Sequence, residues 1–444
     1  MKSFKKSCFI LPIKLSNKHS ILYHSLTGSI LLVDKEVGEL LEKEDFEKIP
    51  SEYLDVLKEQ NFIVPHDLDE IALYEFLFNS IKFTSSTESF VILTTYDCNF
   101  KCVYCYEWRN NVISSIYMNS ETASNVIKYI EEKIQKRASK VSIALYGGEP
   151  LLNINIGFTI LENVSKYCEK IGTELETGII TNGSLLTKDI AEKICDYNVK
   201  SIQVTIDGTK EIHDKRRPFK NGKGSFSIII ENLKDVIDIF PPNTITIRFN
   251  MDKMNFHNLP KFLDYLESIG FKSKIKFWIG VPQGVSPYCN IYQYAGKELY
   301  KRVFEAWKIV IERGFLFHYE PGVNVCSAIT NTSRIIDPLG KIYKCWGLVG
   351  MDQFSVGDVF EGENSLAYVK FVGRNPLHFS RCRKCNILPY CNGGCLYESY
   401  FKIGDPFKIA CGTVFGRETL KTIIKLYVMD RYKDILKKKG IKME

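Results

Sequence analysis

The sequence predicts an α/β protein built around a partial (β/α)6 barrel. Six strand-like apolar runs alternate with five amphipathic helical patterns between Phe90 and about Val281. This order implies a parallel sheet, because each crossover between parallel strands passes through a helix. The unusual loops of this region all follow predicted strands, and parallel β/α sheets carry their chemistry there.

The predicted strands and helices can be stated as ranges. The strands are 90–93, 141–145, 178–180, 201–206, 244–249 and 275–279. The helices are 120–136, 155–171, 188–197, 226–240 and 259–269. The loops after the first five strands carry three cysteines, Gly147-Gly148-Glu149-Pro150, Thr181-Asn182-Gly183, Asp207-Gly208 and Arg248-Phe249-Asn250. We expect all five loops to open onto one mouth of the barrel.

Two further regions flank the barrel. Residues 1–80 combine a hairpin around Leu26-Thr27-Gly28, helical patterns and a final apolar run, which suggests a winged-helix-like module. It resembles the peptide-recognition modules at the front of enzymes that modify ribosomal peptides, although a cap without a binding role fits the pattern too. We expect the barrel at 85–285, a loop-rich cysteine domain at 286–415, and a C-terminal helix with a basic tail at 416–444.

Composition narrows the function classes. The 444 residues carry a net charge of +7 from 59 basic and 52 acidic side chains, which is too mild to indicate nucleic acid but suits an acidic electron carrier. No stretch of about 20 residues lacks charge, so we expect no membrane span. The apolar run from Cys8 to Ile13 is too short for a signal peptide. We therefore expect a cytoplasmic protein, in which the 14 cysteines are metal ligands or buried thiols.

Three cysteines, Cys98, Cys102 and Cys105, follow the first predicted strand within eight residues. An odd number in so tight a loop cannot pair as disulfides. Tetrahedral zinc would need a fourth ligand, and none follows nearby. A cubane iron–sulfur cluster can be held by three cysteines, which leaves one iron open for another ligand.

These residues carry a family resemblance. The spacing Cys98-x3-Cys102-x2-Cys105, followed by Gly147-Gly148-Glu149-Pro150 and Thr181-Asn182-Gly183, resembles the radical S-adenosylmethionine (SAM) superfamily. The resemblance implies that the open iron of a [4Fe–4S] cluster binds the amine and carboxylate of SAM. It also implies reductive cleavage to a 5′-deoxyadenosyl radical, which abstracts a hydrogen atom. A low-potential electron donor of the ferredoxin or flavodoxin type would then be a partner.

The resemblance extends to other site residues. Tyr104 matches the aromatic residue near the adenine, and Gly147, Gly148, Glu149 and Pro150 match the motif that meets the SAM amine. Thr205 resembles a residue near the ribose, or else is an ordinary strand residue, and Asn182 and Asn250 are weaker candidates of the same kind. A partner for the SAM carboxylate is not identifiable, since Arg216 and Arg248 are only guesses.

A second set of seven cysteines follows the predicted barrel. They are Cys326, Cys345, Cys382, Cys385, Cys391, Cys395 and Cys411. Structural zinc is an alternative, but seven sulfurs divide badly into sets of four. The spacing resembles the SPASM extension of radical SAM enzymes, which implies two auxiliary [4Fe–4S] clusters. In that pattern Cys382, Cys385, Cys391 and Cys411 hold one cluster, and Cys326, Cys345 and Cys395 hold the other, with one iron unassigned.

Two activities compete within this family. The first is maturation of a ribosomal peptide through a C–S (thioether) or C–C cross-link, in which an open auxiliary iron meets a substrate thiol and accepts the remaining electron. The alternative is an anaerobic sulfatase maturase, which makes formylglycine from Cys or Ser of a client protein. That activity is disfavoured because no cysteine lies between Ser327 and Lys344, and because Trp346 stands where those enzymes carry a catalytic aspartate. A third hypothesis is a cluster-containing electron-transfer protein without radical chemistry. Glu149 argues against it, because such a protein has no use for the SAM-binding motif.

Overall fold

The computed structural model describes residues 4–105, 115–135, 138–282, 287–315, 322–323, 325–412, 416–438 and 440–441. Lys136, the predicted end of the first barrel helix, lies outside them. The contacts divide the chain into two compact units. We call Ser85–Leu316 with Asn331–Val372 the sheet unit, and Met1–Thr84 with Phe317–Thr330 and Gly373–Glu444 the terminal unit.

The sheet unit contains the predicted parallel sheet. Its first six strands are β6 (Thr87–Thr95), β7 (Lys140–Gly147), β8 (Glu174–Thr181), β9 (Val199–Thr205), β10 (Ile245–Asn250) and β11 (Ile275–Gly280). They pair in chain order, and every neighbouring pair is parallel. Each predicted strand lies within one of these six or overlaps it. The α/β fold class is therefore confirmed.

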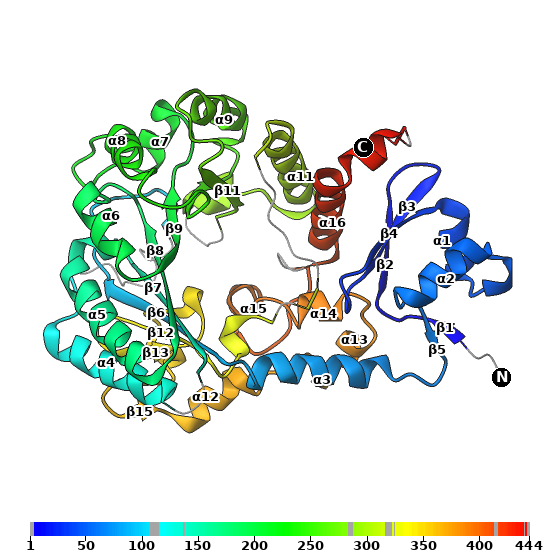
Figure 1. Ribbon diagram of the computed structural model, residues 1–444, viewed down its shortest axis with the longest axis horizontal. Helices are drawn as coiled ribbons and strands as arrows, with labels where there is room; N and C mark the ends of the chain where they lie inside the picture. The colour runs from blue at the N-terminus through cyan, green and yellow to red at the C-terminus, as the bar shows by residue number, and fades with distance from the viewer. Residues whose placement is uncertain are drawn as a thin grey trace. The chain divides into compact units, whose positions relative to one another are not determined.

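The helices between these strands cover the sheet, and Figure 1 shows them along its outer face. They are α4 (Ser120–Ile134), α5 (Ile154–Ile171), α6 (Lys188–Cys195), α7 (Lys210–Arg216), α8 (Phe226–Val236) and α9 (Leu259–Ser268). Four buried residues of α5, namely Gly157, Leu161, Val164 and Cys168, recur at helical spacing, and the helix ends at left-handed Gly172. The short helix α7 is absent from the predicted set.

The sheet also continues beyond its predicted edge. Strand β12 (Ser333–Ile336) pairs in parallel with β6, and β13 (Lys341–Tyr343), β14 (Gly357–Asp358) and β15 (Gly362–Glu363) extend it antiparallel. Buried Arg334 of β12 donates to Glu88 of β6 across 2.7 Å and to Glu363 of β15 across 2.7 Å. The remaining helices of this unit are α10 (Pro287–Tyr292), α11 (Gly296–Glu312) and α12 (Ser365–Val372).

The terminal unit joins the two ends of the chain around a three-stranded antiparallel sheet. Its strands are β2 (Ile10–Lys14), β3 (His19–His24) and β4 (Ile30–Asp34), and β1 (Phe4–Lys6) pairs with β5 (Ile63–Pro65). Its helices are α1 (Lys35–Glu42), α2 (Ser51–Glu59), α3 (Glu70–Phe83), α13 (Ser380–Arg383), α14 (Leu388–Cys391), α15 (Leu396–Ile403), α16 (Arg417–Arg431) and α17 (Lys433–Lys438).

This three-stranded sheet is packed on both faces. Leu22 and Val33 face a core with residues of α1 and α2, whereas Ile21 and Tyr23 pack with Ile424 of α16. Residues near the N-terminus thus share a hydrophobic core with residues near the C-terminus. The predicted domain boundaries at 80, 285 and 415 stay predictions.

Candidate functional site

The loop after β6 brings Cys98 next to the loop after β8. The Cys98 sulfur accepts hydrogen bonds from Phe100 N across 3.4 Å and from Asn182 Nδ2 across 3.8 Å. Asn182 Nδ2 also donates to Asn99 Oδ1 across 2.8 Å. Burial raises the pKa of Cys98 to about 12, whereas N–H donors to the sulfur act in the opposite direction because they favour its charged form. Cys105 N donates to Cys102 O across 3.3 Å, so a turn brings these two cysteines together.

The paired glycines after β7 allow two strand ends to meet. A Cβ on Gly147, whose φ is +142°, would lie 2.3 Å from Thr95 O, and one on Gly148 would lie 2.3 Å from Asp97 O. Gly148 N donates to Thr95 O across 3.1 Å, and Glu149 N donates to Asp97 O across 2.9 Å. The close approach that these glycines permit is therefore to the backbone that leads into Cys98.

Glu149 is fully buried, and its carboxylate is turned into the protein. Oε1 accepts from Thr181 Oγ1 across 2.7 Å and from Leu151 N across 3.1 Å, and Oε2 accepts from Asn182 N across 2.6 Å. Burial raises the pKa of Glu149 from 4.5 to about 7, although these donors act in the opposite direction. These bonds tie the loops after β7 and β8 together, and a role for Glu149 in meeting the SAM amine stays a prediction. Pro150, next in the chain, accepts a bond from Thr94 Oγ1 at its carbonyl.

Tyr104 is joined to the loops after β9 and β10. Its hydroxyl donates to Asp207 Oδ2 across 2.6 Å and accepts from Arg217 Nη1 across 2.7 Å and from Asn250 Nδ2 across 3.1 Å. Asn250 N also donates to Asp207 Oδ1 across 3.0 Å. The two residues named from the sequence, Tyr104 and Asn250, are thus in contact. Thr205 lies at the end of β9 and is nearly buried.

Arg216 lies in a buried ion-pair network next to Tyr104. It donates to Asp207 Oδ2 across 3.2 Å and to Asp252 Oδ2 across 2.6 Å, and its guanidinium lies 5.1 Å from the centre of the Tyr104 ring. Asp207 and Asp252 already neutralise this guanidinium, so the guess that it binds a SAM carboxylate is disfavoured. The other guess, Arg248, donates from Nε to Asn250 Oδ1 across 2.9 Å.

Sequence reasoning did not name Asp207, Arg217 and Asp252 as site residues, nor Asn99 and Ser184. Asn99 donates to Ser184 Oγ across 2.9 Å beside Asn182. Asp207 follows β9 and Asp252 follows β10. The available signal was their place within three residues after predicted strands. Arg217 had no such signal, because α7 was not predicted.

The second cysteine set falls into groups within the terminal unit. Burial, together with the charges of Cys385, Cys382 and Cys411, raises the pKa of Cys391 to about 11. These four thiols therefore lie near one another. Burial also raises the pKa of Cys395, and Glu398 and Cys326 add to that rise. Cys345 follows β13 in the sheet unit, so its grouping with Cys326 and Cys395 stays a prediction.

Within the described ranges, no group of three or more His, Cys, Asp or Glu side chains is arranged to hold a single metal ion. The assignment of these cysteines to particular clusters stays a prediction.

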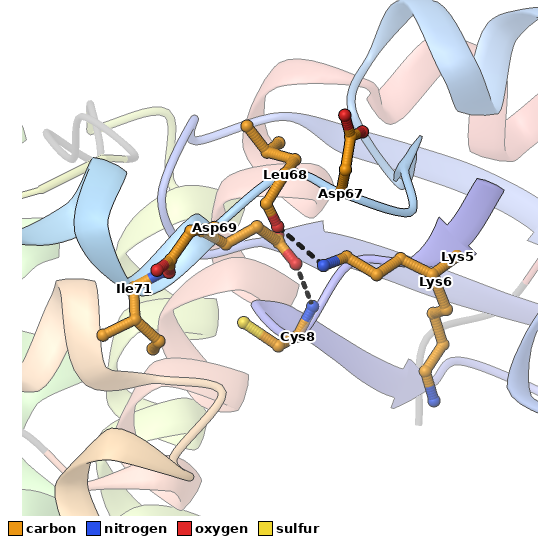
Figure 2. Close-up of a pocket in the computed structure, with 8 residues that line it drawn as sticks. Lys5, Lys6, Cys8, Asp67, Leu68, Asp69 and Ile71 are labelled. Carbon is orange, nitrogen blue, oxygen red and sulfur yellow. Dashed lines mark hydrogen bonds between the residues drawn. The ribbon is translucent and has the colours of Figure 1, made fainter. Parts of the chain in front are cut away.

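The terminal unit also has a surface pocket of about 440 Å³, shown in Figure 2. There Glu70 Oε2 accepts from Cys8 N across 3.0 Å, and Lys5 Nζ donates to Leu68 O across 2.6 Å. Partial burial and the Glu70 carboxylate raise the pKa of Cys8 to about 12. Cys8 belongs to neither of the two predicted cysteine sets.

A family model described as "Radical SAM superfamily" matches residues 92–266, from β6 into α9. Residues 92–266 thus form a radical SAM domain. Members of this superfamily use a [4Fe–4S] cluster and SAM, which are therefore its cofactors. The three cysteines after β6 fit such a cluster, since they lie in one short loop with N–H donors on the Cys98 sulfur.

Radical SAM relatives cover most of the chain. The radical SAM cyclopropyl synthase TigE of Paramaledivibacter caminithermalis is 25% identical over 90% of this chain and 91% of its own length. The cysteine-type anaerobic sulfatase-maturating enzyme of Clostridium novyi is 25% identical over 67% of this chain and 85% of its own. The chain is thus an enzyme related to maturases that modify peptides or proteins.

A solved structure supports the fold. Streptococcus suis SuiB bound to precursor peptide SuiA has a TM-score of 0.53 and 16% identity, covering 91% of this chain and 98% of that one. Among the described residues, none of the helices combines the length and the apolar character that crossing a membrane requires.

Proposed function

We propose that this radical SAM enzyme matures a ribosomally made peptide by forming a C–C or C–S (thioether) cross-link. When bound, the cluster and SAM supply a 5′-deoxyadenosyl radical that abstracts a hydrogen atom, and auxiliary clusters supply an acceptor for the remaining electron. The new bond replaces two bonds to hydrogen, so the product is two hydrogens lighter. A ferredoxin or flavodoxin type of protein is the proposed electron donor.

The observation that supports radical chemistry best is the connection Cys98–Asn182–Glu149. It links the three-cysteine loop with the loops after β7 and β8 at the carboxyl end of the sheet. We propose Cys98, Cys102 and Cys105 as the ligands of the SAM-binding cluster. The SAM contacts proposed are Tyr104, Gly147, Gly148, Glu149, Pro150, Asn182, Thr205 and Asn250, and Glu149 also holds the loops after β7 and β8 in place.

The proposed product follows from the relatives. The name of the relative TigE specifies a cyclopropyl product, and its similarity extends over nine tenths of this chain. A cyclopropyl ring is closed by a C–C bond, which favours the C–C form of the cross-link. We propose Cys382, Cys385, Cys391 and Cys411 for one auxiliary cluster, and Cys326, Cys345 and Cys395 for the other.

The anaerobic sulfatase maturase is the second candidate, since the Clostridium novyi relative has that activity. Trp346 argues against it. Its ring packs on Tyr146 at 5.1 Å between centroids, next to the glycine pair, and both belong to an apolar cluster with Leu93 and Tyr343. An aromatic residue in such packing cannot take a proton as an aspartate does.

The test uses the reconstituted full chain with SAM, a strong reductant and the precursor peptides encoded beside its gene. We expect 5′-deoxyadenosine and a peptide two hydrogens lighter. Cys98→Ala should abolish both products, whereas Cys195→Ala, an exposed cysteine of α6, should retain them. Formation of 5′-deoxyadenosine without a lighter peptide would refute cross-linking. Formylglycine in a sulfatase-derived peptide would establish the second candidate.

We further propose that the three-stranded sheet of the terminal unit binds the leader of that peptide by adding a strand at β4. Among the described residues, β4 pairs only with β3. Successive N–H groups of a strand point in opposite directions, so proline at Leu31 and at Leu32 in turn removes one outward and one inward donor. We expect the variant that removes the outward donor to weaken leader binding, while its thermal unfolding midpoint stays equal to that of the parent. Unchanged leader affinity in both variants would exclude this edge.

A further inference from the structure

Arg374 is a buried cation between the loops that carry the second cysteine set. It is 6% exposed and belongs to the terminal unit. Nη2 donates to Gly393 O across 2.7 Å and to Lys408 O across 3.4 Å, and Nη1 donates to Gly394 O across 3.2 Å. The planar fork of an arginine suits such a set of carbonyls, which a lysine cannot satisfy together.

The backbone between Cys391 and Cys395 is shaped to receive this guanidinium. Asn392, Gly393 and Gly394 all have left-handed φ values of 45°, 84° and 78°. Such a run is accessible to glycine at little strain. The side chain of Asn392 accepts a 2.8 Å hydrogen bond from buried Tyr74, which anchors the run. Two carbonyls of a loop between two candidate ligands therefore face Arg374.

One nitrogen of this guanidinium makes no hydrogen bond among the described residues. Within the described residues, Nε is buried without a hydrogen-bond partner. A buried N–H of a charged group that makes no hydrogen bond is unfavourable, so an acceptor is expected there. Burial lowers the pKa of Arg374, and the nearby charges that oppose this belong to Cys326, Cys391, Cys395 and Cys382. These thiols come from both proposed auxiliary clusters.

We propose that Arg374 sets the reduction potentials of both auxiliary clusters, with its Nε–H donating to a cluster sulfur. A [4Fe–4S] cluster with four thiolates gains one negative charge when it takes one electron. A fixed positive charge stabilises the reduced form more than the oxidised form, and a hydrogen bond to sulfur acts in the same direction. Burial keeps this charge unscreened. Arg374 thus makes both clusters easier to reduce. The inference rests on the auxiliary clusters assigned above.

The test is a redox titration of the full chain with dithionite as the electron source, followed by electron paramagnetic resonance. Cys98, Cys102 and Cys105 are replaced by alanine, so that only auxiliary clusters contribute. This background should hold about eight iron atoms per chain. Arg374→Gln removes the charge. Arg383→Gln is the matched control, since Arg383 flanks Cys382 but is exposed and donates only to Leu377 O among the described contacts.

We expect Arg374→Gln to keep its iron and to lower the midpoint potential of each auxiliary cluster by at least about 59 mV. For one electron this corresponds to a tenfold change in the reduction equilibrium. Arg383→Gln should leave both midpoint potentials unchanged. Unchanged or raised potentials in Arg374→Gln overturn the inference. If that variant loses iron, Arg374→Lys decides: retained iron supports a role for the charge, and lost iron shows that Arg374 only holds the loops. A background chain without auxiliary iron would refute the cluster assignment itself.

Discussion

The hydroxyl of Tyr104 donates a 2.6 Å hydrogen bond to Asp207, a residue 103 positions later in the chain. Tyr104 stands between two proposed cluster ligands, and Asp207 follows β9. The contact thus ties the cysteine loop to the far half of the parallel sheet. Arg217 and Asn250 donate to the same hydroxyl.

Replacing Tyr104 by phenylalanine should destabilise the chain by about 1–3 kcal/mol, because a buried N–H of Arg217 would lose its acceptor and Asp207 Oδ2 would lose one of its two donors. Chemical unfolding of the chain without cofactors measures this. Tyr117→Phe is the control, since its half-exposed hydroxyl also donates to an aspartate, Asp97, and water can replace it. Equal losses of unfolding free energy for the two substitutions would contradict the proposal that burial of the Tyr104 hydroxyl makes its hydrogen bonds costly to remove.

Arg216→Gln should be more severe, at about 3–5 kcal/mol, because it leaves the carboxylates of Asp207 and Asp252 buried without a cation between them. The same unfolding measurement applies. Lys274→Gln breaks the exposed ion pair with Asp238 and should cost about 1 kcal/mol or less. A small effect of Arg216→Gln would mean that water reaches this network.

Glu149 should make stability depend on pH. Burial raises its pKa to about 7, so between pH 4.5 and 7 the folded chain holds a proton that the unfolded chain has lost. The free energy of unfolding therefore falls as pH rises through this window, by about 3 kcal/mol relative to Glu149→Gln, and stays low above it.

The comparison to make is the unfolding free energy of the parent and of Glu149→Gln at several pH values. Glu162→Gln serves as the control. Its hydrogen bond to Lys166 lowers the pKa of exposed Glu162, so its difference from the parent should stay flat above pH 4.5. A flat difference for Glu149→Gln as well would show that Glu149 is ionised throughout.

Gly148→Ala should disrupt the cysteine loop, because the added Cβ meets backbone oxygens of Asp97 and Tyr96 at 2.3 and 2.6 Å. We expect a loss of about 3 kcal/mol and a fall in iron bound at the first cluster. Gly172→Ala, with a φ of +70° and open space around it, should cost about 1–2 kcal/mol and keep the iron. Full iron in Gly148→Ala would show that the two strand ends can separate.

The sequence by itself determined the local patterns. Apolar alternation and helical spacing are properties of short segments, so six strands and five of the helices between them could be predicted. The spacing of Cys98, Cys102 and Cys105 within one loop is also a local pattern, and their role as cluster ligands stays a prediction. The expectation that the loops after the strands share one edge of the sheet also follows from local order, because parallel strands end on the same side.

The tertiary structure alone decided which distant residues meet and which way each side chain turns. Glu149 meets Thr181 and Asn182, which follow a different strand, because its loop is pressed against the end of β6. Strand β12 joins the sheet beside β6, and Arg374 reaches loops on both sides of Cys395. These are contacts across long stretches of chain, and no local pattern records them.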